Sequence, residues 1–339
     1  MPAEQRSEDR DPSRATAYGA RVLAWADGLQ RRHTVLGFPY AVIKKYGDDA
    51  GGRQAALITY YGFLSIFPLL LVAVSVLTTV LVANAELRAD IVENLVPPPL
   101  QDTVDTALAS MPSSGLPLAV GILGLLFAGT GVVFSAYETL NHVAGVPMRA
   151  RFGFVPRYAR VLVMLVVVVA SGVVVSTLTV AVSTRPDQVA LQRVSAAGST
   201  YAVVFLVLVG AAKLLVARPV TLRITWLAAA AGALAVTLVL SAGGWLLAKL
   251  VSSAGPVYGS FATVAGCFAL LYLVSQALLY SAEAAVVLHL RLWPRGLDTS
   301  RPTRADLRAL ERLAREQERL AGARVELKFE TPPGKGGLH

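Results

Sequence analysis

The chain is poor in the residues that form disulfides and metal clusters. Its 339 residues include only one cysteine, Cys267, and four histidines. A lone cysteine excludes an intrachain disulfide and a cysteine-based metal cluster. The sequence also lacks a GxxxxGK[ST] run, the phosphate-binding loop of many ATP-driven proteins. We therefore expect no cofactor and no metal, and we expect any energy input to come from ions, a substrate gradient or another protein.

Charged residues are scarce as well. Asp, Glu, Lys and Arg make up 16% of the chain, whereas hydrophobic residues make up 55% and the mean hydropathy is +0.57. A soluble domain of this length needs more charge to cover its surface. The composition therefore predicts an all-α, polytopic membrane protein.

Six apolar runs are long enough to cross a bilayer, for which a helix needs about 20 residues. The predicted spans are residues 55–83, 116–137, 161–182, 200–217, 224–251 and 258–290. The third is rich in valine, but it is too long and continuous for a strand. Glycines in the second span, such as Gly124 and Gly131, permit a close approach between helices. Together the spans form one membrane domain, residues 53–292.

The segments outside this domain are polar and charged. Residues 1–52 are predicted to form a cytoplasmic tail without a cleavable signal peptide, followed by juxtamembrane amphipathic helices, one of them at 38–47. These helices fit equally well in the membrane interface or packed under the bundle. Residues 84–115 form an acidic outer connection, either a lid or a solvated loop. Residues 293–339 are predicted to be a charged cytoplasmic tail, with a solvated helix at 303–330 whose positive charge could instead touch anionic lipid.

Positive charge predicts the orientation of the chain. The N-terminal segment carries nine Lys and Arg residues and the C-terminal tail eleven, whereas the connection after the first span carries one. Lys and Arg are enriched in cytoplasmic segments of membrane proteins. Both termini are therefore expected to be cytoplasmic. The net charge of +9 lies mainly beside apolar runs, which favours membrane lipids over nucleic acid as partners.

The last span carries an acidic residue, Glu283, inside an apolar helix. A charge at the bilayer centre costs about 2.5–3.5 kcal/mol, so such a residue needs a partner, a proton or water. Tyr272, Gln276 and Tyr280 precede it at helical spacing and form one polar stripe with it. This stripe is expected to face protein, and Glu283 is our first candidate for a substrate or ion pathway.

Polar faces also occur in the first two spans. Tyr61, Ser65 and Pro68 share a face of the first span, and Pro68 is expected to kink that helix near Ser65. This face suits either a polar cavity or helix packing through small residues. Glu138 and Asn141 lie near the inner end of the second span. We include all five residues in the predicted pathway.

Four basic residues are predicted to lie at the inner ends of the spans and to bind an anionic headgroup: Arg160, Lys213, Arg218 and Arg223. The planar guanidinium of arginine matches the geometry of phosphate. Lys213 is also explained by snorkelling of its ammonium to the interface. As an alternative, Arg160, Lys213 or Arg223 pairs with Glu283.

Three stretches and one residue together are fairly specific in a six-span chain: AALITYYGFLSIFPLLL at 55–71, VYGSFATV at 257–264, SAE at 281–283, and Asn141. With them, residues 38–292 resemble the YihY/BrkB membrane proteins, within that family the YhjD-like branch. Ser281 stands where the family usually has glycine. The resemblance implies a bacterial inner-membrane protein of six helices with a role in export of lipids or lipid-linked molecules. The family has also been labelled a ribonuclease, but the sequence has no cluster of histidines and acids for that reaction.

Two functions stay open on the sequence. The first is a transporter or flippase for an amphiphilic anionic substrate, such as a lipid or a polyprenyl phosphate, with Glu283 coupling transport to protons. The second is a non-transporting scaffold or envelope-integrity protein that recruits partners or anionic lipids. A membrane-embedded enzyme is disfavoured, because the sequence shows neither a nucleophile with a base nor a metal site. The sequence sets no oligomeric state.

Overall fold

The structure is a computed structural model that describes residues 25, 27–30, 34–83, 115–183, 189–218, 222–253, 255–297 and 302–328. Six described helices are long and apolar enough to cross a membrane: α3 (Gly51–Ala83), α6 (Gly115–Val143), α7 (Phe154–Ser183), α8 (Val189–Leu215), α9 (Leu222–Ser253) and α10 (Gly255–Leu290). This confirms the predicted all-α membrane fold with six candidate spans. The predictions for residues 1–24 and 84–114 lie outside the described residues.

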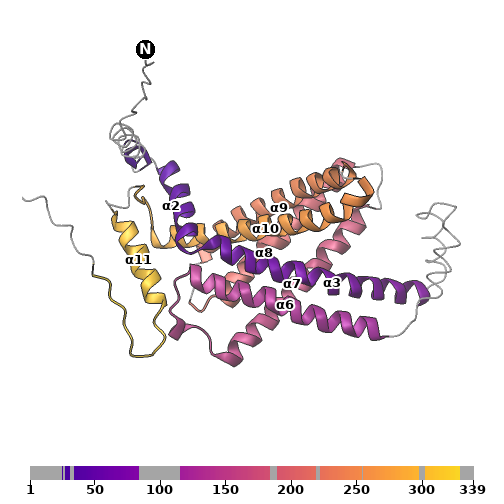
Figure 1. The fold of residues 1–339 in the computed structure, drawn as a ribbon, viewed down its shortest axis with the longest axis horizontal. Coiled ribbons are helices and arrows are strands. Elements are labelled where there is room, and N and C mark those ends of the chain that lie inside the picture. The colour runs from indigo at the N-terminus through magenta and orange to yellow at the C-terminus, as the bar shows by residue number, and fades with distance from the viewer. Residues whose placement is uncertain are drawn as a thin grey trace, which may run out of the picture.

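The six spans form a closed ring. Each packs against the next one along the chain, and α10 packs back against α3. The pairs α3/α6 and α9/α10 make the most extensive contacts. In Figure 1 these two pairs lie close together at the end that carries α2 and α11 and diverge toward the opposite end. We call the first the closed end of the bundle and the second its open end.

The buried core lies at the closed end. In α10 the buried side chains begin at Ser275, and no described residue between Phe261 and Val274 is buried. In α9 the buried residues fall between Thr225 and Thr237. A cluster of apolar side chains joins α6, α7 and α8 there: Val133, Tyr137, Val161, Met164, Leu165 and Leu215. The closed end is therefore where the bundle is most tightly packed.

Glycines bring α3 and α6 together, as predicted. A Cβ atom at Gly124 would lie 2.9 Å from the ring of Pro68, and one at Gly131 would collide with the ring of Tyr61. The helix α3 continues through Pro68 to its end at Ala83. These contacts use the small size of glycine, because any larger residue would push the two helices apart.

Three helices extend well beyond the predicted spans. Helix α8 begins at Val189 rather than near residue 200, α7 begins at Phe154 rather than near residue 161, and α6 continues to Val143 rather than ending at residue 137. In α8 the hydroxyls of Ser199 and Thr200 donate to the carbonyl of Ala196 at 3.0 and 2.8 Å. Such bonds satisfy polar side chains within the helix itself. The polar composition of this stretch therefore did not mark a loop.

Helix α2 (Thr34–Asp48) packs against α10 at the closed end. Ala41 and Val42 are buried there against Val287 and Leu292. The structure shows the helix packed on the bundle, and its position in the membrane interface stays a prediction. Its opposite face leaves Ile43 58% exposed, which is the apolar surface that the amphipathic pattern indicated.

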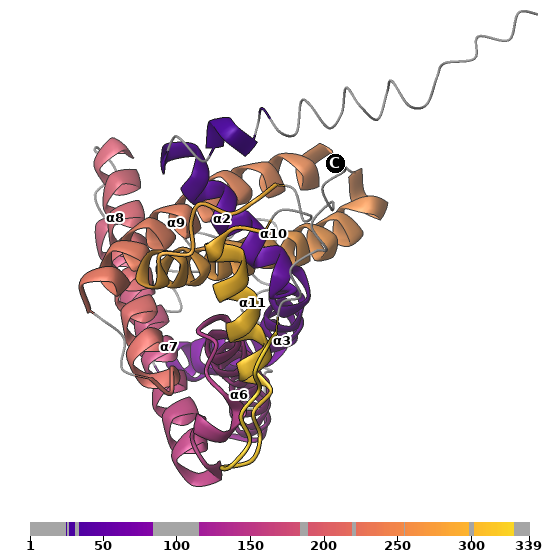
Figure 2. The same ribbon diagram turned by 90° about the vertical axis from the view of Figure 1, so that its left-hand side faces the viewer.

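Helix α11 (Arg304–Glu316) lies across the closed end, as Figure 2 shows. Its first turn is a capping box, in which the Thr303 hydroxyl accepts from the Asp306 backbone and the Asp306 carboxylate accepts from the Thr303 backbone. The prediction of a solvated helix over 303–330 was wrong in length and in environment. After Glu316 the chain turns away, and the Glu318 carbonyl accepts a hydrogen bond from the Arg149 backbone at 3.0 Å.

Candidate functional site

The centre of the candidate site is a buried cluster at the closed end that joins three helices. The Glu283 side chain of α10 is fully buried, and the Lys45 ammonium of α2 donates to its Oε2 at 2.8 Å. The same ammonium donates to Asp49 Oδ2 at 2.5 Å and to the Val143 carbonyl at the end of α6 at 3.0 Å. A lysine ammonium has three protons to donate, and here all three are used. One side chain therefore ties α2, α6 and α10 together.

The charges in this cluster do not balance. Lys45 supplies one positive charge to two carboxylates, Glu283 and Asp49. Burial alone would lower the pKa of Lys45, but the attraction of the two carboxylates outweighs it and raises that pKa, so the lysine stays charged. The second oxygen of Glu283, Oε1, is buried without a hydrogen-bond partner among the described residues. The cluster can thus accept one proton without losing its lysine.

The polar stripe of α10 faces protein, as predicted. Its neighbour is Tyr46 of α2, whose ring stacks on Tyr280 with ring centroids 4.2 Å apart. The Gln276 amide donates to the Tyr46 hydroxyl at 3.5 Å. One turn farther, the Tyr272 hydroxyl lies beside Gly52 at the start of α3. The stripe therefore runs from the Lys45 cluster along the boundary between α10 and the segment that joins α2 to α3.

Asn141 lies in the core and connects two helices. Its amide nitrogen donates to the carbonyls of Tyr137 and Leu215 at 2.8 Å each, and its Oδ1 accepts from the Ala217 backbone at 2.9 Å. The side chain is fully buried. These bonds hold the end of α6 against the end of α8. The contacts of Asn141 are those of a structural link.

Tyr61 and Glu138 lie in a different place from the α10 stripe. They line a groove of about 520 Å³ between α3 and α6, together with Gln54. Glu138 forms ion pairs with Arg151 at 2.5 Å and Arg157 at 3.7 Å. Farther along α3, the Ser65 hydroxyl donates to a carbonyl of its own helix and Pro68 packs on α6. The residues predicted to line one pathway are therefore divided among the α10 stripe, the α3/α6 groove and helix contacts outside both.

The four predicted headgroup residues do not form one cluster. Arg160 lies over the ring of Phe152, 3.6 Å from its centroid, whereas Lys213 and Arg223 are exposed. Arg218 lines a pocket beside α11. The alternative that Arg160, Lys213 or Arg223 neutralises Glu283 was wrong, since the partner is Lys45.

An ion-pair network holds the start of α11 on the closed end. The Asp306 carboxylate accepts from Lys44 at 3.0 Å and from Arg295 at 2.6 Å, and Arg295 also pairs with Asp48 at 2.6 Å. Burial alone would raise the pKa of Asp306, but hydrogen bonds from the Gly296 backbone, Arg295 and Thr303 outweigh burial and hold it well below its usual range. The ionised carboxylate therefore docks the helix.

The last turn of α11 is held by Glu316, which is 2% exposed. Its carboxylate pairs with Arg151 at 2.6 Å and with His142 Nδ1 at 2.7 Å. Arg151 is the residue that also pairs with Glu138, so it connects the α3/α6 groove to α11. The closed end is thus covered by a helix bound at both of its ends.

Apolar side chains from all six spans surround a cavity of about 270 Å³ inside the ring. Ser281 lines it, and its hydroxyl donates to the Ala228 carbonyl of α9 at 2.8 Å. The Ser281 hydroxyl thus forms a hydrogen bond to a neighbouring helix, at a position where the YihY/BrkB proteins usually have glycine. An apolar cavity of this kind can hold the chain of an amphiphile.

The sequence reasoning missed Lys45 and Asp49 as members of the cluster. The signal that could have found them is their spacing, because oppositely charged residues at i and i+4 lie on one face of a helix. Asp306 and Glu316 were also missed. Acids in the first and last turns of a charged helix looked like solvent-facing residues, and nothing in their spacing indicates the arginines that bind them.

No group of three His, Cys, Asp or Glu side chains within the described ranges is placed to hold a metal. Among known proteins, residues 42–306 match the family model described as Virulence factor BrkB. The match is to the family as a whole and does not distinguish its branches. Neither the curated proteins nor the solved structures gave a match. Because the matched stretch includes all six spans and the Lys45–Glu283 pair, the chain belongs to the virulence factor BrkB family.

Proposed function

We propose that this protein transports an amphiphilic anionic substrate, a lipid or a lipid-linked precursor such as a polyprenyl phosphate, across the bacterial inner membrane. The closed end and both termini lie on the cytoplasmic side. The observation that carries the proposal is Glu283, a fully buried carboxylate that shares one lysine with Asp49 and whose second oxygen has no hydrogen-bond partner in the described part of the chain. Ionisable residues inside membrane spans often belong to substrate or proton pathways.

Protonation of Glu283 would loosen the closed end. A neutral carboxyl group attracts the Lys45 ammonium much less strongly than a carboxylate does, while Asp49 still holds the lysine. The tie between α2 and α10 would then weaken, but the tie between α2 and the end of α6 would stay. A proton can in this way shift the balance between a closed and an open cytoplasmic end.

The apolar cavity supports the choice of an amphiphile. It is lined by all six spans and is almost wholly apolar, so it suits an acyl or isoprenoid chain rather than a sugar or an ion. No chemical step is part of the proposal.

The test is lipid exchange between leaflets by the full chain in liposomes, with labelled anionic lipids and a polyprenyl phosphate, over pH 5 to 8. We expect wild-type exchange to change with pH and Glu283→Gln to remove that dependence. Ser275→Ala is the matched control, because Ser275 is buried on α10 about two turns away and carries no titratable group. Unchanged exchange and unchanged pH dependence in Glu283→Gln would remove the proton role.

A second candidate is a scaffold that moves no substrate, and the Lys45–Glu283 pair favours it as well, since buried ion pairs also fix helix arrangement. The exchange of both charges, Lys45→Glu with Glu283→Lys, separates the two functions. The scaffold is favoured if the swapped protein folds and keeps its cellular role, and if neither the swapped protein nor the wild type exchanges lipid between leaflets.

A further inference from the structure

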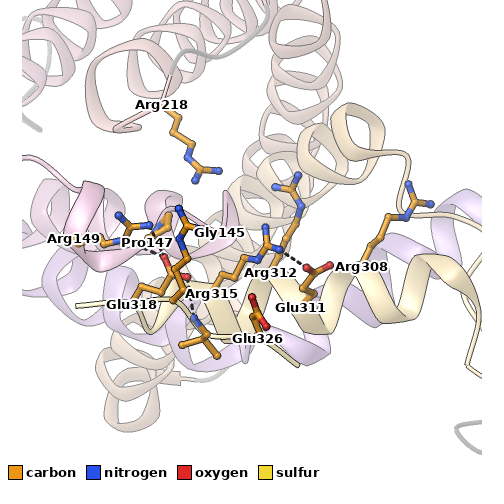
Figure 3. Close-up of a pocket in the computed structure, with 12 residues that line it drawn as sticks. Gly145, Pro147, Arg149, Arg218, Arg308, Glu311, Arg312, Arg315, Glu318 and Glu326 are labelled. Carbon is orange, nitrogen blue, oxygen red and sulfur yellow. Dashed lines mark hydrogen bonds and ion pairs between the residues drawn. The ribbon is translucent and has the colours of Figure 1, made fainter. Parts of the chain in front are cut away.

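A second site lies outside the bundle, where α11 faces the connection between α8 and α9. It is a pocket of about 490 Å³ between α11, the chain that follows it, the turn at Gly145–Arg149 and Arg218. Figure 3 shows Arg218 reaching toward the side chains of α11 from the opposite wall. The walls therefore come from parts of the chain that are far apart in sequence.

Positive charge is in excess in this pocket. Six arginines line it against three glutamates. Glu318 accepts from Arg149 at 2.8 and 3.0 Å, and Glu311 pairs with Arg315. The third glutamate, Glu326, is exposed. Two arginines are thus neutralised inside the pocket, and the others share one exposed acid.

The remaining arginines include two that face each other across the pocket. Neither Arg218 nor Arg312 has an ion-pair partner among the described residues. Burial, and then the nearby charges of Arg218 and Arg315, lower the pKa of Arg312. Arg308 donates to the backbone carbonyl of Arg291 at 3.0 Å and has no carboxylate partner in the described part of the chain. Like charges are therefore held together at a cost that a bound anion would relieve.

We propose that this pocket binds a multiply charged, phosphate-bearing anion between Arg218 and Arg312. The guanidinium group presents paired N–H donors that match phosphate oxygens, and arginine is preferred where phosphate is bound bidentately. The volume exceeds that of a single phosphate, so it suits a pyrophosphate group or a phosphorylated headgroup. The proposal stands on the pocket alone and does not depend on transport.

Binding would have a structural consequence. Arg218 belongs to the connection between α8 and α9, and Arg312 belongs to α11. An anion between them would add a third attachment of α11 to the bundle, beside the ion pairs of Asp306 and Glu316. The occupancy of the pocket would thus be linked to the docking of α11, because a ligand stabilises the state that binds it.

The test uses the purified full chain in neutral detergent at physiological ionic strength, with calorimetric titration of two probes. The probes are inorganic pyrophosphate and a short-chain phosphatidic acid, and short-chain phosphatidylcholine, a zwitterion without net charge, is the comparison. We expect saturable binding of at least one phosphate probe. Tighter binding of pyrophosphate indicates a free phosphate ligand, whereas tighter binding of phosphatidic acid, with none of phosphatidylcholine, indicates a lipid headgroup.

Variants locate the site. We expect Arg312→Gln and Arg218→Gln each to weaken binding of the phosphate probe about tenfold, the usual effect of losing one charge-assisted hydrogen bond. Arg319→Gln is the matched control, because Arg319 is an exposed arginine on the same tail that does not line the pocket. If Arg312→Gln fails to fold, Arg218→Gln carries the test, since Arg218 is exposed. No saturable binding of either probe, or an equal loss in Arg319→Gln, would overturn the proposal.

Discussion

Lys45 and Glu283 are 238 residues apart in the sequence, yet the lysine Nζ lies 2.8 Å from the glutamate Oε2 in the most tightly packed part of the bundle. The lysine comes from α2, a short helix outside the six spans. The membrane domain therefore does not neutralise its own buried acid. A helix that the hydropathy pattern places outside the bundle completes the core at the closed end.

Removal of Lys45 should destabilise the protein more than removal of the pair. Lys45→Met leaves Glu283 and Asp49 buried together without a cation, which we expect to cost about 3–5 kcal/mol. A triple change to Lys45→Met, Asp49→Asn and Glu283→Gln should recover much of that loss. The measurement is unfolding of the purified protein in mixed micelles, with the exposed Lys213→Met as control. A Lys45→Met protein as stable as the control would contradict the structural role of the pair.

Asn141 should be needed for the packing of α6 on α8. Asn141→Leu leaves the Leu215 carbonyl and the Ala217 N–H without their side-chain partner, and each group left unpaired costs about 1–3 kcal/mol. Thermal unfolding should show the loss. Thr237→Val is the comparison, because the Thr237 hydroxyl donates to the Ala233 carbonyl within its own helix. Equal stability of the two variants would show that the interhelical bonds contribute little.

A larger residue at Gly131 should separate α3 from α6. Gly131→Val places a branched side chain against the ring of Tyr61, and overpacking of this kind typically costs about 1–3 kcal/mol. The Tyr61→Ala change in the same protein should restore part of the loss by opening space. Gly210→Val serves as control, since a Cβ at Gly210 meets nothing within 4 Å. If valine destabilised the helix through its low helix propensity alone, Tyr61→Ala would not restore stability. Recovery in the double variant therefore identifies the steric contact with Tyr61 as the cause.

The docking of α11 should depend on pH through Asp306. Its pKa in the folded protein is below the usual value of about 4, so its contribution to stability is complete above that usual value and is lost as the pH falls below it. We therefore expect the amides of α11 to stay protected from hydrogen exchange between pH 7 and 4 and to lose protection several-fold below pH 4. Asp306→Asn should lose protection already at pH 7.

The exchange experiment contains its own reference. Amides of α9 between Thr225 and Thr237 lie in the buried core of the bundle and should keep their protection in both proteins. Loss of protection in α9 together with α11 would mean that the whole bundle opens. Full protection of α11 in Asp306→Asn at pH 7 would show that Glu316 alone holds the helix.

The spans and their count could be predicted from the sequence, because length and hydropathy constrain a membrane helix strongly. The face of α10 that carries Gln276, Tyr280 and Glu283 was also predictable from its helical spacing. The element that covers this face was not. Periodicity tells which side of a helix is buried, but it does not tell which distant segment lies against it, and Lys45 and Tyr46 come from another part of the chain.

Two kinds of error have physical causes. The predicted start of α8 is too late because the polar stretch before residue 200 lowers the hydropathy, although Ser199 satisfies its hydroxyl inside the helix. The tail was read as one solvated helix because its charges suggest solvent. Asp306 and Glu316 instead form ion pairs with Arg295 and Arg151. The charge of a residue in the sequence does not show which distant residue it will contact.

The polar contacts between helices are concentrated at the closed end of the bundle, about which the helices can rotate. Lys45, Asn141 and the attachments of α11 all lie at that end, while the far halves of α9 and α10 have no buried side chain among the described residues. A small rotation of the helices about the closed end would therefore produce a larger displacement at the open end. The polar contacts at this end are therefore the places where a changed side-chain interaction would alter the orientation of the helices along their full length.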